Sequence, residues 1–143
     1  MDAIEPRLTV EDDFTPAQAA ALDDRIYEFN AARTGVDDGR LLAIWVRDDA
    51  GELIGGLYGW TWAGYLEVRS LWVREDARGK GLGSRMLAAA EAEGLARGAR
   101  VAVLDTHSFQ APDFYRRFGY EEVATIDDCP LGHQRHCFRK RLA

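Results

Sequence analysis

The segment RGKGLGS at residues 78–84 decides how the rest of the sequence is interpreted. It follows an apolar run at 65–73 that contains β-branched and aromatic residues, and it precedes a stretch at 84–97 rich in alanine and leucine. Glycines lack a Cβ, so their backbone N–H groups can close on an anion, and a helix start adds unpaired N–H groups with a partial positive charge. Arg78, Lys80 and Arg85 supply three full positive charges. The segment therefore predicts a strand, a phosphate-binding loop and a helix in succession.

Two common phosphate-loop patterns fail at this segment. The pattern G-x-x-x-x-G-K-[ST] occurs nowhere in the chain. The dinucleotide pattern G-x-G-x-x-G fails because its last position falls on Ser84 or Met86. The pattern that fits is R-x-x-G-x-G, formed by Arg78, Gly81 and Gly83. A nucleotide-phosphate enzyme is thus a weak interpretation.

The rest of the chain predicts a mixed α/β domain. Short turns at 48–51 and 62–64 separate three strand-like runs, which favours an antiparallel meander. Thr15 and Pro16 are suited to the start of a helix. Strands are expected at 6–11, 41–47, 52–61, 65–73, 100–106, 120–126 and 133–142, and helices at 15–30, 84–97 and 111–118. No repeat or long linker interrupts the 143 residues, so one domain is expected over 1–143.

A second motif lies at residues 108–120, SFQAPDFYRRFGY. This motif and the glycine segment at 78–84 match the motifs of one protein family. Together they resemble the GNAT superfamily of acetyl-CoA-dependent N-acetyltransferases, whose later motif is N-x-x-A-x-x-(apolar)-Y-x-x-x-G-(aromatic). The chain departs from that motif at Ser108, where the family often has asparagine. The likeness covers roughly residues 41–120, and the ending Pro130–His133 resembles a bacterial subgroup. The positions that match the later motif are Ala111, Phe114, Tyr115, Gly119 and Tyr120.

The resemblance implies a central, mostly antiparallel sheet of six to seven strands with about four helices around it. The fourth and fifth strands of the family, here 65–73 and 100–106, are splayed and hold the cofactor between them. It implies that Tyr115 lies near the CoA sulfur and protonates the departing thiolate, for which a phenol is suited. It also implies a cofactor site in which the loop binds pyrophosphate and the strand backbone pairs with pantetheine: Leu71, Trp72, Val73, Arg78, Gly79, Lys80, Gly81, Leu82, Gly83, Ser84, Ser108 and Tyr115.

Transfer to an amine also needs a base, because a lysine-like amine is protonated below pH ~10.4. The candidate is Glu67, which lies eleven residues before Arg78, the spacing at which some histone-acetylating relatives carry their base. A water chain is an alternative base, and Glu67 is also explained as a solvent-facing carboxylate paired with Arg69.

The function indicated is acetyl transfer from acetyl-CoA to a primary amine of a small molecule or protein, by direct attack in a ternary complex. The alternative is a non-catalytic acyl-CoA sensor or interaction domain, which the serine at 108 allows.

Acidic residues near the N-terminus are compatible with a cationic acceptor, although solvated surface charge explains them more simply. Dimers are common in the family, and no feature of the sequence fixes one here. Five central aromatics could wall an acceptor pocket, but at least three are expected to pack in the core or on a sheet face, with Trp62 as the exception: Trp45, Trp60, Trp62, Tyr65 and Trp72.

Charge, apolar runs and cysteine spacing argue against several other classes of protein. A net charge of -6 argues against a nucleic-acid partner. The start resembles no signal peptide and no apolar run approaches a membrane span of ~20 residues, so neither secretion nor a membrane partner is expected. Two cysteines favour a reducing cytoplasm. The spacing C-x3-H-x2-H-C at 129–137 does not match a zinc site, so no metal is expected.

Overall fold

The computed structural model describes residues 3–143, which form two compact units with a division after Val36. The first unit contains the helix α1, Pro16–Thr34. Thr15 begins it with a reciprocal capping box: its hydroxyl accepts from the Gln18 N–H at 3.1 Å, and the Gln18 side chain accepts from the Thr15 N–H at 2.8 Å. The helix ends at Gly35, whose φ of 74° suits a glycine. The predicted helix is confirmed and is four residues longer at its end.

The strand predicted at 6–11 is wrong, because this segment pairs with no strand in the described part of the chain. A strand is stable only when a neighbour satisfies its backbone groups, and an apolar alternation alone does not supply that neighbour.

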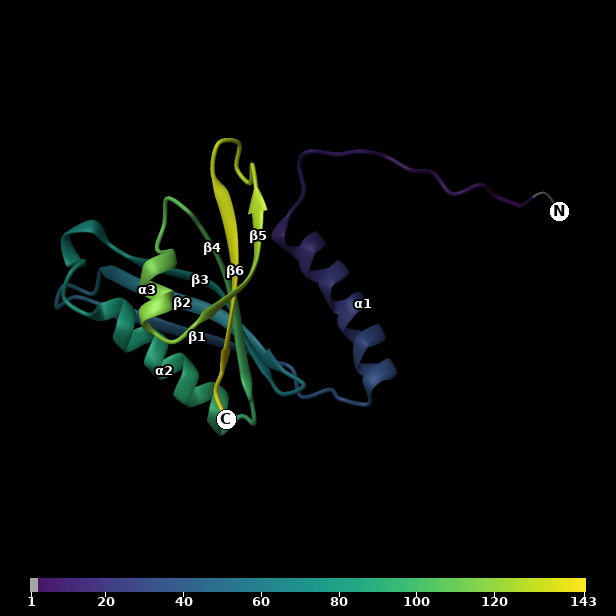
Figure 1. The fold of residues 1–143 in the computed structure, drawn as a ribbon. Coiled ribbons are helices and arrows are strands. Elements are labelled where there is room, and N and C mark those ends of the chain that lie inside the picture. The colour runs from purple at the N-terminus through teal and green to yellow at the C-terminus, as the bar shows by residue number, and fades with distance from the viewer. Residues whose placement is uncertain (1–2) are drawn as a thin grey trace. The chain divides into compact units, whose positions relative to one another are not determined.

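The second unit is built on one six-stranded sheet in the order β1-β2-β3-β4-β6-β5 (Figure 1). All strand pairs are antiparallel except β3 with β4. The six other predicted strands are therefore confirmed, as is the mixed, mostly antiparallel sheet. The elements of this unit are β1 Arg40–Arg47, β2 Leu53–Trp62, β3 Tyr65–Val73, a 3-10 turn η1 Glu75–Ala77, α2 Leu82–Ala96, β4 Val101–His107, α3 Pro112–Arg117, β5 Glu121–Asp127 and β6 Gln134–Arg141.

The strands β3 and β4 pair along only part of their length. Residues 65–68 of β3 are in register with 101–104 of β4, and the ladder then stops. Just beyond it, the pairing of β2 with β3 shifts between Tyr58 and Gly59, so that Arg69 is an extra residue in a β-bulge. The bulge bends β3, and its second half has no partner in β4. This geometry agrees with the splayed strands that were expected.

The helix α2 covers one face of the sheet, and α3 lies on the same side (Figure 1). Met86 and Leu87 of α2 are buried against Leu57 and Leu66 of the sheet. Ala90 is buried on the same side, whereas Ala89 is exposed.

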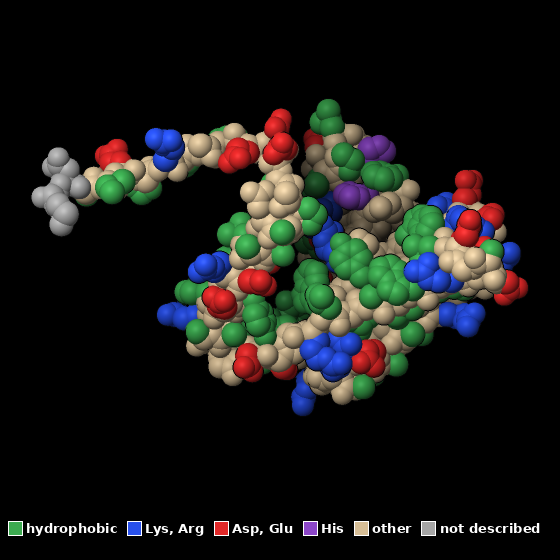
Figure 2. All heavy atoms as spheres, turned by 180° about the vertical axis from the view of Figure 1, so that it is seen from behind, with side chains coloured by type: hydrophobic (Ala, Val, Ile, Leu, Met, Phe, Trp, Pro, Cys, Tyr) green, Lys and Arg blue, Asp and Glu red, His purple; other side chains and the backbone are tan. Residues whose placement is uncertain are grey.

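The five central aromatic residues lie on the other face of the sheet. Alternation along β1, β2 and β3 places Trp45, Trp60, Trp62, Tyr65 and Trp72 opposite α2. Trp45 is 57% exposed and Trp72 is 47% exposed, and the other three are half-buried. Packing in the core is therefore wrong for these residues, whereas packing on a sheet face is confirmed for the three half-buried rings. Figure 2 shows the side of the molecule opposite α2, where hydrophobic side chains gather on the surface.

In the described part of the chain, the helices are all too short or too polar to span a membrane.

Candidate active site

The glycine loop forms a short backbone arch that leads into α2. Gly79 and Gly81 have φ angles of 75° and 79°, a region that side chains with a Cβ disfavour. Gly81 is the N-cap of α2, and no side chain caps this end. The first hydrogen bond of the helix runs from the Arg85 N–H to the Gly81 carbonyl at 3.0 Å. The N–H groups of the first turn, Leu82–Ser84, therefore have no acceptor within the helix. This is the arrangement in which backbone N–H groups bind an anion.

The positive side chains of the loop differ in how they are held. Arg78 donates from Nε to the carbonyl oxygen of Val73, the last residue of β3, at 2.9 Å. This bond fixes the guanidinium at the end of β3 and leaves its other N–H groups for a ligand. Lys80 is exposed. The loop thus combines one anchored and one exposed cation beside unpaired backbone donors.

The loop also lies close to α3 and β3. A methyl group built on Gly83 would be 3.5 Å from Cζ of Phe114 and 3.8 Å from Cδ2 of Leu71. Phe114 precedes Tyr115 on α3, and their rings meet edge to face with centroids 5.1 Å apart. The structure therefore brings the loop, Leu71 and the α3 helix that carries Tyr115 to one place.

Tyr115 is only 8% exposed and sits among aromatic rings. Its ring lies 5.9 Å from that of Tyr120 and 6.2 Å from that of Phe138. Burial raises the pKa of the Tyr115 phenol above its usual value, so the group stays protonated at neutral pH. Its hydroxyl has no hydrogen-bond partner among the described residues. Among the same residues, no fully buried side-chain oxygen is left without a partner, so the hydroxyl oxygen is not fully buried. The oxygen therefore reaches the surface and can donate to a ligand.

The second half of β3 offers an open backbone edge. Leu71, Trp72 and Val73 pair with β2 on one side, at Leu57, Gly56 and Gly55. On the other side they have no strand partner in the described chain. The Val73 carbonyl accepts the Arg78 Nε–H, and the other outward backbone groups are free to pair with the amides of an extended ligand, as strands do with peptides.

Glu67 lies on the face opposite Tyr115. Its register partner on β4 is Val103, and Asp105 follows two residues later on the same face. Burial raises the pKa of the Glu67 carboxyl, and the charge of Asp105 raises it further, whereas Arg69 lowers it. No ion pair joins Glu67 to Arg69 among the described residues. The carboxyl is half-buried.

Ser108 makes a contact that the family motif did not indicate. Its hydroxyl accepts the Gln134 N–H at 3.0 Å, and its own N–H donates to the Gln134 carbonyl at 2.9 Å. These bonds join the end of β4 to the start of β6. The Ser108 hydroxyl thus keeps its proton and one lone pair for further partners.

The cysteine and histidine residues at 129–137 form no metal cluster. Within residues 3–143 no group of three or more ligating side chains could hold a metal ion. Cys129 and Cys137 are both free thiols.

Two parts of this site left no signal in the sequence. Asp105 raises the pKa of Glu67, and it is itself bound by Arg135, whose Nε lies 2.9 Å from the carboxylate. Thirty residues separate these two partners, so only the pairing of β4 with β6 reveals them. The bulge at Arg69 is likewise visible only in the register of β2 and β3.

The chain is similar to known acetyltransferases in both sequence and fold. The sequence profile described as "Acetyltransferase (GNAT) domain" matches residues 40–122. Blasticidin-S acetyltransferase of Streptomyces morookaense is 41% identical over 96% of this chain and 97% of its own. The crystal structure of an acetyltransferase from Bacillus cereus is 29% identical, with a TM-score of 0.77 over 93% of this chain and 97% of that one.

A more distant structure, an aminoglycoside 6'-N-acetyltransferase complexed with coenzyme A, shares the fold. It is 18% identical, with a TM-score of 0.63 over 72% of this chain and 73% of that chain. The profile spans more than half of the sequence, and the Streptomyces relative spans nearly all of it. The chain therefore belongs to the GNAT family of acetyltransferases and is an acyltransferase enzyme.

Proposed function

We propose that residues 1–143 form one catalytic domain that transfers an acetyl group from acetyl-CoA to a primary amine by direct attack in a ternary complex. The observation that carries the proposal is the uncapped start of α2 behind two glycines of positive φ, next to the open edge of β3. The pyrophosphate of CoA suits the first element and its pantetheine amides suit the second. Seven loop residues, Arg78–Ser84, hold the pyrophosphate, and Leu71–Val73 hold pantetheine. The two free thiols fit a reducing cytoplasm.

The reaction uses both faces of the sheet. The amine nitrogen approaches from the face of Glu67 and attacks the thioester carbonyl carbon in the gap where β3 and β4 diverge. A C–N bond forms and the C–S bond breaks. Glu67, or a water that it orders, accepts the proton that the amine loses, and Tyr115 donates its phenolic proton to the leaving sulfur on the other face. The raised pKa values favour these roles. The pKa of the Glu67 carboxyl moves toward neutral pH, which makes the carboxylate a better base, and the Tyr115 phenol stays protonated.

We infer that the acceptor is a cationic small molecule. The face of Glu67 carries the aromatic rings of Trp60 and Tyr65, which can receive a cation. Asp105 lies on the same face, where Arg135 already pairs with its carboxylate, so the rings and Glu67 carry this inference. The 41% identical relative is named for an antibiotic, blasticidin S.

An acetyl-CoA-dependent screen tests the function. Blasticidin S, aminoglycosides, polyamines and peptides are incubated with the enzyme, and products are detected by free-thiol release and mass spectrometry. Acetylation of a cationic small molecule is expected. Tight acetyl-CoA binding without thiol release over the whole panel would instead favour the non-catalytic acyl-CoA sensor. In that interpretation the Ser108 hydroxyl serves to bind the Gln134 N–H.

Replacing Tyr115 with phenylalanine is expected to lower kcat about 100-fold, because it removes the general acid. The dissociation constant of acetyl-CoA should change by less than about twofold, since the ring that packs against Phe138 remains. Steady-state kinetics and calorimetry measure the two quantities.

Tyr120→Phe is the matched control. Tyr120 is also buried, but its hydroxyl donates to Glu91 at 3.0 Å and takes no part in the proposed reaction. This variant should lose stability and keep its turnover. Equal turnover losses in both variants would remove Tyr115 from the mechanism.

Replacing Asp105 with asparagine is expected to move the acid limb of the pH–rate profile to lower pH. Glu67 must be ionised to accept a proton, so kcat/KM falls as the pH drops through the pKa of Glu67. The charge of Asp105 raises that pKa, and its removal lowers it. Asp49→Asn, in the exposed turn before β2, is the control and should leave the limb in place. An unmoved or raised limb in Asp105→Asn would show that Glu67 is not the base.

A further inference from the structure

The helix α3 carries Tyr115 but is too short to hold its own orientation. It has six residues, Pro112–Arg117, and no side chain caps its start. Isolated helices of this length are unstable in water, so contacts with the rest of the fold must fix it. The apolar contacts are those of Phe114 and Tyr115 with neighbouring rings. Hydrogen bonds from backbone N–H groups hold its two ends, from the Ala111 N–H to the Thr106 hydroxyl and from the Tyr120 N–H to the Tyr115 carbonyl. Among the described residues, the side-chain polar contacts of the helix are those of Arg116, the residue next to Tyr115.

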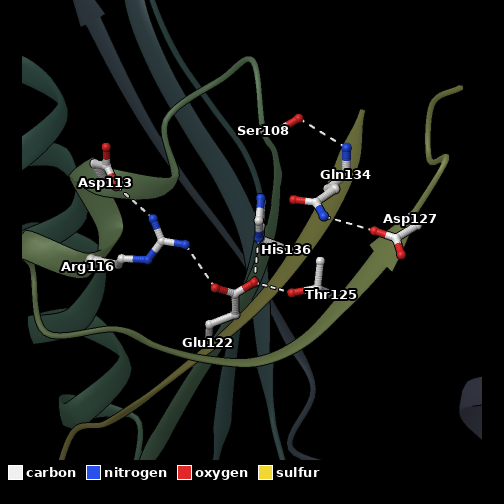
Figure 3. A network of polar contacts seen from close by, with 8 residues as sticks. All are labelled: Ser108, Asp113, Arg116, Glu122, Thr125, Asp127, Gln134 and His136. Carbon is white, nitrogen blue, oxygen red and sulfur yellow. Dashed lines mark hydrogen bonds and ion pairs between the residues drawn. The ribbon is translucent and has the colours of Figure 1, made fainter. Parts of the chain in front are cut away.

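Arg116 is tied to the sheet by one carboxylate. Its guanidinium donates to Asp113 on its own helix at 2.7 Å and to Oε2 of Glu122, on β5, at 2.8 Å. The same guanidinium lies over the ring of Phe138 at 5.5 Å. Figure 3 shows Glu122 at the centre of this network, with one carboxylate oxygen directed to Arg116 and the other to His136.

The second oxygen of Glu122 joins the network to β6. Oε1 lies 2.5 Å from Nδ1 of His136 and also accepts a hydrogen bond from the Thr125 hydroxyl. His136 is 7% exposed, so its ring is held inside the fold. These three donors lower the pKa of the Glu122 carboxyl to about 2, and it is therefore a carboxylate throughout the pH range of an enzyme assay.

A β-bulge directs these groups to one face. Glu122 pairs with Phe138 and Ala124 pairs with Cys137, so the register shifts at Val123. Thr125 then pairs with His136. Without the extra residue, Glu122 and Thr125 would point to opposite faces because they are three positions apart. With it, both reach His136 on the face of α3. Bulges re-aim side chains in this way beside functional sites.

We propose that Glu122 is a positioning residue for the acetyl transfer: its carboxylate binds Arg116 and His136 at once and so fixes α3 with the Tyr115 hydroxyl directed at the CoA sulfur. The inference rests on the proposed role of Tyr115. Glu122 touches neither substrate nor cofactor in this account. It acts through the helix, so its loss should affect turnover only when Tyr115 is present.

The first test needs no acceptor and no turnover. The chain has five tyrosines, and with 13C-labelled tyrosine the signal of Tyr115 is the one absent from Tyr115→Phe. In Glu122→Gln, which keeps the shape and removes the charge, this signal should shift or broaden. Glu121→Gln is the matched control, because Glu121 is the neighbouring carboxylate on β5 and pairs with Arg139 at 3.4 Å. An unchanged Tyr115 signal in folded Glu122→Gln would overturn the proposal.

The second test is a double-mutant cycle in turnover, with acetyl-CoA and blasticidin S as substrates. Glu122→Gln should lower kcat about tenfold with an unchanged KM for acetyl-CoA. Added to Tyr115→Phe, the same change should lower kcat by less than about twofold, because the group it positions is gone. Equal losses in both backgrounds would show a general structural effect and overturn the proposal.

The two tests separate the possible failures. If no cationic small molecule of the panel is acetylated, the acceptor proposal fails, and the tyrosine signal still decides whether Glu122 positions α3. If Glu122→Gln does not fold, Arg116→Gln replaces it, since Arg116 is exposed and its substitution breaks the same link from the helix. The shifted Tyr115 signal and the non-additive loss of turnover are expected for this variant as well.

Discussion

Gly81→Trp is expected to lower the affinity for acetyl-CoA at least about 100-fold, because two or more hydrogen bonds from backbone N–H groups to a charged phosphate are each worth about 1.5–3 kcal/mol. No atom lies within 4 Å of a Cβ built on Gly81, so the new Cβ meets no protein and the indole is expected to occupy the space assigned to the pyrophosphate. Its φ of 79° also strains any residue with a Cβ, by roughly 1–2 kcal/mol. Isothermal titration calorimetry measures the loss.

Gly51→Trp separates the two effects. Gly51 has a φ of 82° and the same open surroundings, but it lies in the turn between β1 and β2. It therefore reproduces the backbone strain without filling the proposed cofactor site. This variant should bind acetyl-CoA as the wild type does. Matching losses in both variants would mean that the effect at Gly81 is one of stability.

Gly59→Ala is expected to destabilise the fold by about 3 kcal/mol or more, at the upper end of single substitutions. A Cβ on Gly59 would lie 1.8 Å from the carbonyl oxygen of Glu67 and 3.2 Å from Cα of Val68. Both are backbone atoms beside the bulge at Arg69, so neither can move without disturbing the ladder of β2 and β3. Denaturant unfolding followed by circular dichroism measures the change.

Gly55→Ala is the matched control on the same strand. Its Cβ would lie 3.2 Å from Cε of Met86, the end of a flexible side chain that can move aside. A loss below about 1 kcal/mol is expected, partly offset by the lower entropy of the unfolded chain. A loss at Gly59 no larger than this would show that the bulge tolerates a side chain and is not what bends β3.

The sequence was sufficient for elements whose signals are local. The glycines at 79 and 81, the capping Thr15 and the turns at 48–51 and 62–64 act on a few neighbouring residues, and the structure has a loop, a helix start and two hairpin turns there. The family motifs added the splayed strands, which agree with the short ladder of β3 and β4.

Features that depend on distant pairing were not predictable in this way. The strand expected at 6–11 lacks a partner strand in the described chain, which no local pattern reveals. The aromatic residues of β1–β3 point away from α2 because of sheet register, and a hydrophobicity scale cannot distinguish the two faces. The contact of Glu122 with His136 spans fourteen positions and depends on a bulge at Val123.

The most direct measurement of the central claim is a crystal structure of the chain grown with coenzyme A. The account predicts that the pyrophosphate contacts the backbone N–H groups of residues 79–84, that pantetheine runs along Leu71–Val73, and that the sulfur lies beside the Tyr115 hydroxyl. Coenzyme A bound elsewhere, with the start of α2 holding only water, would contradict it.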